Sequence, residues 1–181
     1  MPGHASLTYA DLETFPDDGL RRELIDGEMF VSPAPKLRHQ VISSRLHLAL
    51  GNHAEEHGGA QVFYAPLDVL FSQRDVVEPD LIVVPDEQND ILTEKHIVGV
   101  PALLIEILSE NVRYDRVRKR DLYARWGVPR YWIVDPESDR IEVHALDGDR
   151  YGKPQIFEAG DTLELDILPG FSLDVAKILR R

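Results

Sequence analysis

The chain has 181 residues, of which 43% are hydrophobic, and it carries a formal net charge of −12 with no cysteine. This length and apolar content suit one domain with a sizeable core and exclude an extended disordered chain. The lack of cysteine excludes disulfides, thiolate metal sites and cysteine nucleophiles, so any bound metal needs oxygen or imidazole ligands, which favours Mg²⁺ or Mn²⁺.

The N-terminal third predicts helix, hairpin and helix in that order. Residues 8–15 suggest a short capped helix that ends at Pro16. Two short apolar-alternating segments, 22–26 and 28–32, flank Gly27, and the Asp-Gly pair is a strong hairpin signal. From about residue 39 to 57 the apolar positions have helical spacing, and two glycines end the helix.

The rest of the chain alternates strands with helices. A strongly basic helix is predicted for residues 113–126, with Gly127 as its C-terminal cap. A closing helix is predicted for residues 171–179. Predicted strands cover residues 61–64, 67–71, 77–84, 101–108, 130–135, 141–145 and 155–157. The strand at 101–108, the basic helix and the strand at 130–135 form a βαβ unit, which indicates a mixed α/β fold.

Glu106 lies in the most apolar run of the chain, residues 101–108. Consecutive apolar residues are typical of a strand buried on both faces, where a carboxylate costs several kcal/mol unless a cation or donors meet it. Asp80 opens another apolar strand upstream. Two strand-end carboxylates predict a divalent-metal site for phosphate chemistry. In the simpler alternatives, Glu106 pairs with an arginine and Asp80 caps a turn.

The positive charge is concentrated next to this candidate site. Residues 111–130 contain seven basic and two acidic residues, whereas the rest of the chain has 13 basic and 30 acidic ones. A basic patch of this kind suits a phosphodiester substrate. We expect four arginines of this segment to contact the phosphate backbone without reading bases: Arg113, Arg116, Arg118 and Arg120. The alternative is a solvated helix face.

Lys119 is expected to face the sheet. At about 100° per residue, Tyr123 lies about 40° and Trp126 about 20° from Lys119 around the helix. A lysine on this apolar face either extends outward to solvent or reaches a carboxylate at the strand end. Asp115, four residues earlier, offers a simpler ion-pair partner.

Four motifs in order resemble the Uma2 family of the PD-(D/E)xK restriction-endonuclease-like superfamily. They are Pro79–Val84, Leu104–Ser109, Tyr114–Tyr123 and Gly127–Pro136, and the resemblance covers roughly residues 7–145. The segments 23–28 and His39–Gln40 are similar to the N-terminal part of the family.

The resemblance implies a restriction-endonuclease-like core over about residues 20–145 of a single domain spanning 1–181. A central mixed sheet flanked by helices would carry an N-terminal helix and hairpin and C-terminal β additions. Asp80 and Glu106 would bind Mg²⁺ and Glu23 would contribute to catalysis. The superfamily lysine would fall at position 108, which is leucine here, so Lys119 is expected to replace it.

The favoured hypothesis is a Mg²⁺-dependent endonuclease that hydrolyses phosphodiester bonds, expected in DNA, through a metal-activated water, and that works as a homodimer. The alternatives are an inactive nuclease fold that binds nucleic acid, and a protein-interaction domain. Glu23 is alternatively an exposed hairpin residue and His39 a surface residue. Residues 1–6 show no signal peptide and no apolar run approaches the ~20 residues that span a bilayer, so we expect a cytoplasmic protein without membrane contact.

Overall fold

The computed structural model describes residues 6–16, 18–109 and 112–180. Residues 1–5, most of the segment searched for a signal peptide, lie outside this range. A seven-stranded mixed sheet forms the centre of the molecule, with order β11-β10-β9-β8-β6-β3 and with β12 also paired to β10. Its strands are β3 (Ala60–Tyr64), β6 (Leu81–Pro85), β8 (Leu103–Ile107), β9 (Arg130–Asp135), β10 (Arg140–Asp147), β11 (Arg150–Tyr151) and β12 (Gln155–Glu158).

A second, five-stranded sheet has the order β2-β1-β5-β4-β7. Its strands are β1 (Arg21–Ile25), β2 (Glu28–Ser32), β4 (Val69–Ser72), β5 (Asp75–Val77) and β7 (Ile97–Val98). The C-terminal strands β13 (Thr162–Glu164) and β14 (Ser172–Asp174) pair only with each other in the described residues. The helices are α1 (Tyr9–Leu12), α2 (Leu37–His57), the 3₁₀ turn η1 (Asp86–Ile91), the π-helical segment η2 (Tyr114–Lys119), α3 (Arg120–Trp126) and α4 (Val175–Leu179).

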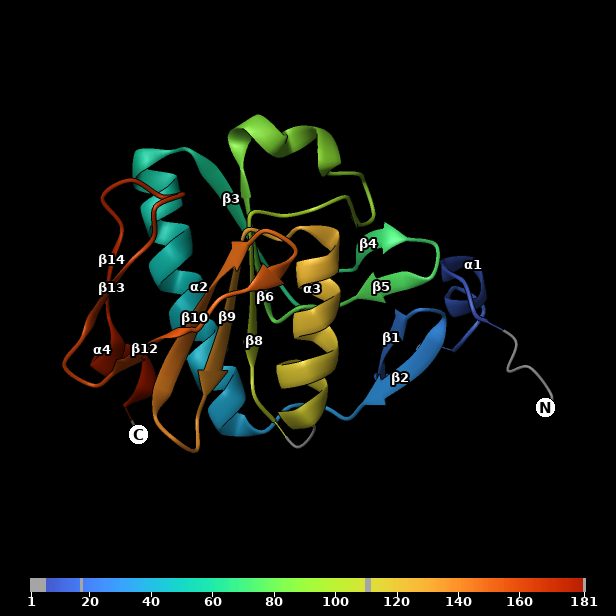
Figure 1. The fold of residues 1–181 in the computed structure, drawn as a ribbon, viewed down its shortest axis with the longest axis horizontal. Coiled ribbons are helices and arrows are strands. Elements are labelled where there is room, and N and C mark those ends of the chain that lie inside the picture. Colours follow the sequence, from blue (N-terminus) through green and yellow to red (C-terminus); the bar gives the residue numbers. More distant parts are fainter. Residues whose placement is uncertain (1–5, 17, 110–111, 181) are drawn as a thin grey trace.

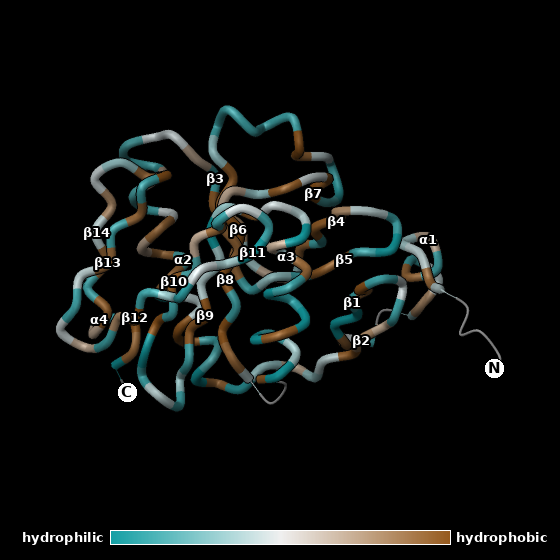
Figure 2. Tube along the Cα trace, viewed as in Figure 1, coloured by the Kyte–Doolittle hydropathy of each residue, from teal (hydrophilic) through white to brown (hydrophobic). Residues whose placement is uncertain are grey.

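Helices cover both faces of the central sheet (Figure 1). Because side chains alternate along a strand, Leu103, Ile105 and Ile107 of β8 pack into a core shared with α2, α4 and the β13–β14 pair. Leu104 and Leu108 pack instead into a core shared with α3 and the second sheet. Figure 2 shows the apolar chain concentrated along β6, β8 and β9 between these layers. Glu106 shares the parity of Leu104 and therefore points to the α3 side.

The expected fold class is confirmed, together with its N-terminal helix and hairpin and its C-terminal β additions. β8 and β9 are parallel and α3 connects them, which confirms the βαβ unit. β1 and β2 form the predicted hairpin, whose turn residues Asp26 and Gly27 have φ of 55° and 77°. Gly27 lies in the left-handed region, and an added Cβ would lie 3.0 Å from the carbonyl oxygen of Leu7, so the turn favours glycine.

Three predictions need correction. The strand predicted for 77–84 is two strands, β5 and β6, in different sheets, because Pro79 has no N–H to continue a ladder. The helix predicted for 171–179 begins only at Val175, since residues 172–174 pair with β13. The basic helix is π-helical over Tyr114–Lys119 before it becomes α3. No helix among the described residues is long and apolar enough to cross a membrane.

Candidate active site

Glu106 meets two donors on the α3 side of β8. Its side chain is 2% exposed. Lys119 Nζ lies 2.8 Å from Glu106 Oε1, and the hydroxyl of Tyr123 donates to the same oxygen over 2.7 Å. The buried carboxylate therefore has both the cation and the hydrogen-bond donor that its desolvation demands.

Lys119 points inward, as the helical-face argument predicted, and contacts more than one carboxylate. Its Nζ lies 2.8 Å from Glu23 Oε1 and 3.9 Å from Asp115 Oδ1. Glu23 belongs to β1 and Glu106 to β8, so the ion pairs of Lys119 link the second sheet to the central sheet. Glu23 also accepts the main-chain N–H of Glu78 over 2.8 Å. It is 1% exposed, so it is not the exposed hairpin residue of the alternative interpretation.

Asp80 lies directly before β6 and is held from three sides. Its Oδ2 accepts the main-chain N–H of Ile107 over 2.7 Å and lies 3.0 Å from Nε2 of His39. Arg21 of β1 donates to Oδ1 over 3.1 Å. His39 is thus buried against a carboxylate and is not the surface residue of the alternative interpretation.

Asp80 and Glu106 line one small cavity of about 30 Å³. A cavity of this size holds about one water-sized group. Its other lining residues are Arg21, Ser32, Pro33, Pro35, His39, Ile107, Ser109, Tyr114 and Asp115. Lys119 and Glu23 do not line the cavity. Lys119 contacts Glu106, and Glu23 contacts Lys119.

The cluster has more carboxylates than cations. Four buried carboxylates contact two cations: Glu23, Asp80, Glu106 and Asp115, with Lys119 and Arg21. Burial lowers the pKa of Lys119, but the carboxylates of Glu106 and Glu23 outweigh it and hold that pKa well above the usual value. The lysine is therefore cationic. The remaining negative charge of the cluster has to be balanced by protons or by a bound cation.

The pKa values of Asp80 and Glu106 are shifted in opposite directions. Burial raises the pKa of Asp80, but hydrogen bonding to His39 and the charge of Arg21 outweigh it and lower that pKa to about 2. Burial raises the pKa of Glu106, and the nearby charge of Asp80 adds to this although Lys119 opposes it. Burial likewise raises the pKa of Asp115 to about 7. Of these three carboxyl groups, Asp80 is the one whose pKa is held below its usual value.

The donor set fits a hard cation only in part. Three carboxylates line the cavity, those of Asp80, Glu106 and Asp115, and the cluster carries excess negative charge, which suits Mg²⁺, an ion commonly held by one or two carboxylates with retained waters. Within the described residues no group of three or more His, Asp or Glu side chains is arranged to hold a metal by itself. Asp80 and Glu106 would therefore hold the ion, with water or substrate completing its shell.

Three of the four arginines expected at the phosphate backbone pair with carboxylates. Arg116 donates to Glu142 over 2.8 Å and to Asp135 over 2.9 Å. Arg118 and Arg120 donate to Glu28 and Asp121 over 2.8 Å and 3.2 Å. Arg113 is exposed at the start of the helix.

Three residues of the cluster carried no strong signal in the sequence. Arg21 belongs to an ordinary hairpin strand, and only the pairing of β1 with β5 brings it to Asp80. Tyr123 was expected on the inner helix face but without a role. The spacing of four residues predicts that Asp115 pairs with Lys119. Its contribution to the cavity lining follows only from the fold.

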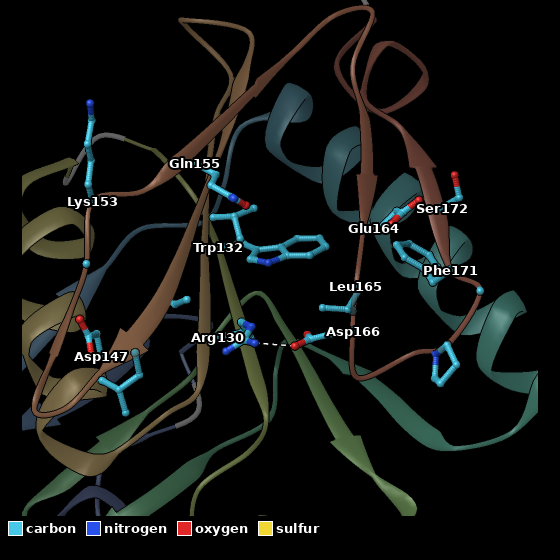
Figure 3. Close-up of a pocket in the computed structure, with 16 residues that line it drawn as sticks. Arg130, Trp132, Asp147, Lys153, Gln155, Glu164, Leu165, Asp166, Phe171 and Ser172 are labelled. Atoms are coloured by element: carbon cyan, nitrogen blue, oxygen red, sulfur yellow. Dashed lines mark hydrogen bonds and ion pairs between the residues drawn. The ribbon is translucent and has the colours of Figure 1, made fainter.

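A roomier cavity of about 760 Å³ lies elsewhere, between β9, β10 and β12 on one side and the β13–β14 pair on the other (Figure 3). The ion pair of Arg130 with Asp166 lies beside the indole of Trp132 there. Trp132 and its neighbour Tyr131 are fully buried. None of the candidate catalytic residues lines this cavity, so size alone does not identify the site.

Comparisons with known proteins agree with this arrangement. Residues 8–176 match the model of the Uma2 family, described as "Putative restriction endonuclease". None of the curated proteins matches the chain. A solved structure, a "putative nuclease belonging to DUF820" from Anabaena variabilis ATCC 29413, has a TM-score of 0.79 at 19% identity and covers 96% of this chain and 97% of its own. That likeness shows the fold, and the family match over most of the chain shows that the protein belongs to the Uma2 family.

Proposed function

We propose that this chain is an endonuclease that uses Mg²⁺ or Mn²⁺ to hydrolyse phosphodiester bonds, with DNA as its substrate. One observation carries the proposal: Asp80 and Glu106, from adjacent strands, line the same cavity. The Asp80 carboxylate is fixed to the main chain of Ile107, so the two ligands keep a constant relation. The family match supports nuclease activity, while the metal and the DNA substrate are inferred from the residues.

Asp80 and Glu106 would hold the metal ion at the cavity. When bound, such an ion supplies Lewis-acid polarisation of the scissile phosphate and lowers the pKa of a water. Arg21 and His39 position Asp80 by hydrogen bonds. Outer partners of this kind orient metal ligands and tune their basicity.

Lys119 acts through Glu106 in this proposal. It lies behind the carboxylate, together with Glu23 and the hydroxyl of Tyr123. Its positive charge lowers the cost of keeping Glu106 ionised in a buried place. Lys119 is therefore a positioning residue, although the family resemblance implies that it takes the place of the superfamily lysine.

Nicking of supercoiled plasmid tests the proposal. Wild type should nick DNA with Mg²⁺ or Mn²⁺, and EDTA should abolish the reaction. Asp80→Asn should be inactive while its circular dichroism matches wild type. Nicking by Asp80→Asn at the wild-type rate would refute the assigned site, and preference for an RNA substrate in parallel assays would reassign the substrate.

One observation favours a second candidate, a catalytically inactive nuclease fold that binds nucleic acid. Glu106 Oε1 is already occupied by Lys119 and Tyr123, so its binding capacity is partly used. In that case DNA affinity would be the same for wild type and Asp80→Asn, and neither would nick with any metal.

A further inference from the structure

The first 18 of the 21 residues of α2, together with the residue before the helix, carry only positive formal charge. Residues 36–54 contain Lys36, Arg38 and Arg45 and no aspartate or glutamate, although the chain has 32 acidic residues against 20 basic ones. α2 packs on the side of the central sheet opposite to α3 and lies beside α4 (Figure 1). This positive surface is therefore distinct from the basic helix that the sequence emphasised.

A groove of about 470 Å³ runs between α2 and the α4 region. We refer to it as the α2–α4 groove. Three cations line it against one acid: Arg45, Lys177 and Arg180, with Asp174. Leu48, which is 55% exposed, contributes apolar surface at its edge. A cationic groove in a chain of net charge −12 is complementary to a polyanion.

The cations of this groove have weaker acidic partners than Arg116 has in the basic helix. Arg45 donates to the main-chain carbonyls of Ile178 and Arg180 over 3.0 Å and 2.6 Å, and these acceptors are neutral. The side chain of Lys177 is 77% exposed and lies 3.9 Å from Asp174. Arg116, in contrast, is held by two carboxylates at 2.8–2.9 Å. A phosphate would have to break those ion pairs at Arg116, whereas the α2–α4 groove offers its charge directly.

The groove is connected to the candidate active site along α2. Arg38 donates to the carbonyl of Leu179 over 2.9 Å, at the same end of α4 as Arg45, and its guanidinium is also paired with Asp139. Arg38 also lines a cavity of about 210 Å³ together with Lys36, His39 and Ser109. His39 and Ser109 in turn line the carboxylate cavity. From Lys36 to Arg45 the helix rises about 14 Å, a length over which duplex DNA carries about eight phosphate charges.

We infer that the phosphodiester backbone of the substrate lies along α2 and in the α2–α4 groove, held by Arg45, Lys177 and Arg180, and not along the arginines that flank Lys119. This inference rests on the proposed nuclease function and deepens it by assigning the substrate-binding surface. Contacts of this kind position a nucleic acid without reading its bases.

Binding of a fluorescein-labelled DNA duplex, followed by anisotropy in EDTA over a series of KCl concentrations, tests the inference. Lys177→Ala/Arg180→Ala removes two exposed cations of the groove. Arg150→Ala/Lys153→Ala removes two exposed cations from the β11 region, so its net charge change is matched. Arg118→Ala/Arg120→Ala tests the competing helix.

The Lys177/Arg180 pair should make the slope of log affinity against log salt less negative by about 1.8, since each lost phosphate contact contributes about 0.9. The Arg150/Lys153 pair should leave the slope unchanged. The inference is overturned if the salt slope becomes less negative only in the Arg118/Arg120 variant, or by the same amount in all three variants. Either result leaves the nuclease function standing. Absence of DNA binding by wild type at low salt overturns the inference, and absence of plasmid nicking with Mg²⁺ or Mn²⁺ overturns the nuclease function.

Discussion

The Asp80 carboxylate accepts the main-chain N–H of Ile107, the residue that follows Glu106, over 2.7 Å. The two strands pair antiparallel, with Leu81 opposite Ile105. One proposed metal ligand is therefore fixed to the strand that carries the other. Preorganisation of this kind reduces the cost of assembling a site.

Asp80→Ala should destabilise the fold, because it leaves Arg21, His39 and the N–H of Ile107 without their acceptor. Loss of one partner of a buried pair costs about 3–5 kcal/mol. Asp80→Asn keeps an acceptor oxygen and should cost less, while both variants lose nicking. Urea denaturation separates the two effects, and equal stability of Asp80→Ala and wild type would show that these contacts are unimportant.

Lys119→Met should also be destabilising by about 3–5 kcal/mol, since Glu23 and Glu106 then lose their buried cation. Glu23→Gln in the same chain should relieve part of that cost. The double variant is thus expected to be more stable than the sum of the single losses by about 0.5–3 kcal/mol, the range typical of contacting residues. Strict additivity in a double-mutant cycle would contradict the contact between Lys119 and Glu23.

Tyr123→Phe removes one donor from Glu106 without creating a large cavity. A hydrogen bond contributes about 0.5–1.5 kcal/mol to stability, and about 1.5–3 kcal/mol where the acceptor is charged. Loss of an outer partner lowers metal affinity by about 10–100-fold. Calorimetric titration with Mn²⁺ measures the second effect. Tyr151→Phe, which removes a bond to the carbonyl of Val128, is the control and should keep wild-type affinity.

Asp135 predicts a pH dependence away from the candidate site. Burial raises its pKa, but the N–H groups of Ser138 and Glu137 and the charge of Arg116 outweigh burial and lower it. A carboxylate with a depressed folded-state pKa stabilises the protein above its unfolded pKa of about 3.9 and loses that contribution as the pH falls. Asp135→Asn should therefore be less stable than wild type at neutral pH, and the difference should vanish in acid. A constant difference in urea denaturation down to acid pH would count against this.

Much of the architecture was predictable because local patterns agreed with the fold. The apolar run around Glu106, the Asp26–Gly27 turn and the cap at Gly127, whose φ is 82°, each have a local cause. The inward direction of Lys119 was predictable too, although it follows from the residue spacing of an α-helix. The segment Tyr114–Lys119 is π-helical, and local propensity does not reveal such an insertion.

The contacts around Asp80 were not predictable, because they depend on long-range pairing. Arg21 and His39 are separated from Asp80 by 59 and 41 residues. The distribution of charge along the sequence was also a poor guide to exposed charge. Arg116 and Arg118 are basic in sequence, yet carboxylates from β10 and β2 neutralise them in the fold.

We propose that Asp80 and Glu106 together bind the catalytic metal. Titration of Mn²⁺ into wild type and Glu106→Gln by calorimetry, with plasmid nicking on the same samples, tests it most directly. Glu142→Gln is the matched control, since Glu142 is also a buried glutamate but pairs with Arg116. Binding and nicking should both be lost in Glu106→Gln and kept in Glu142→Gln. Wild-type binding and nicking by Glu106→Gln would show that Glu106 is purely structural and would contradict the account.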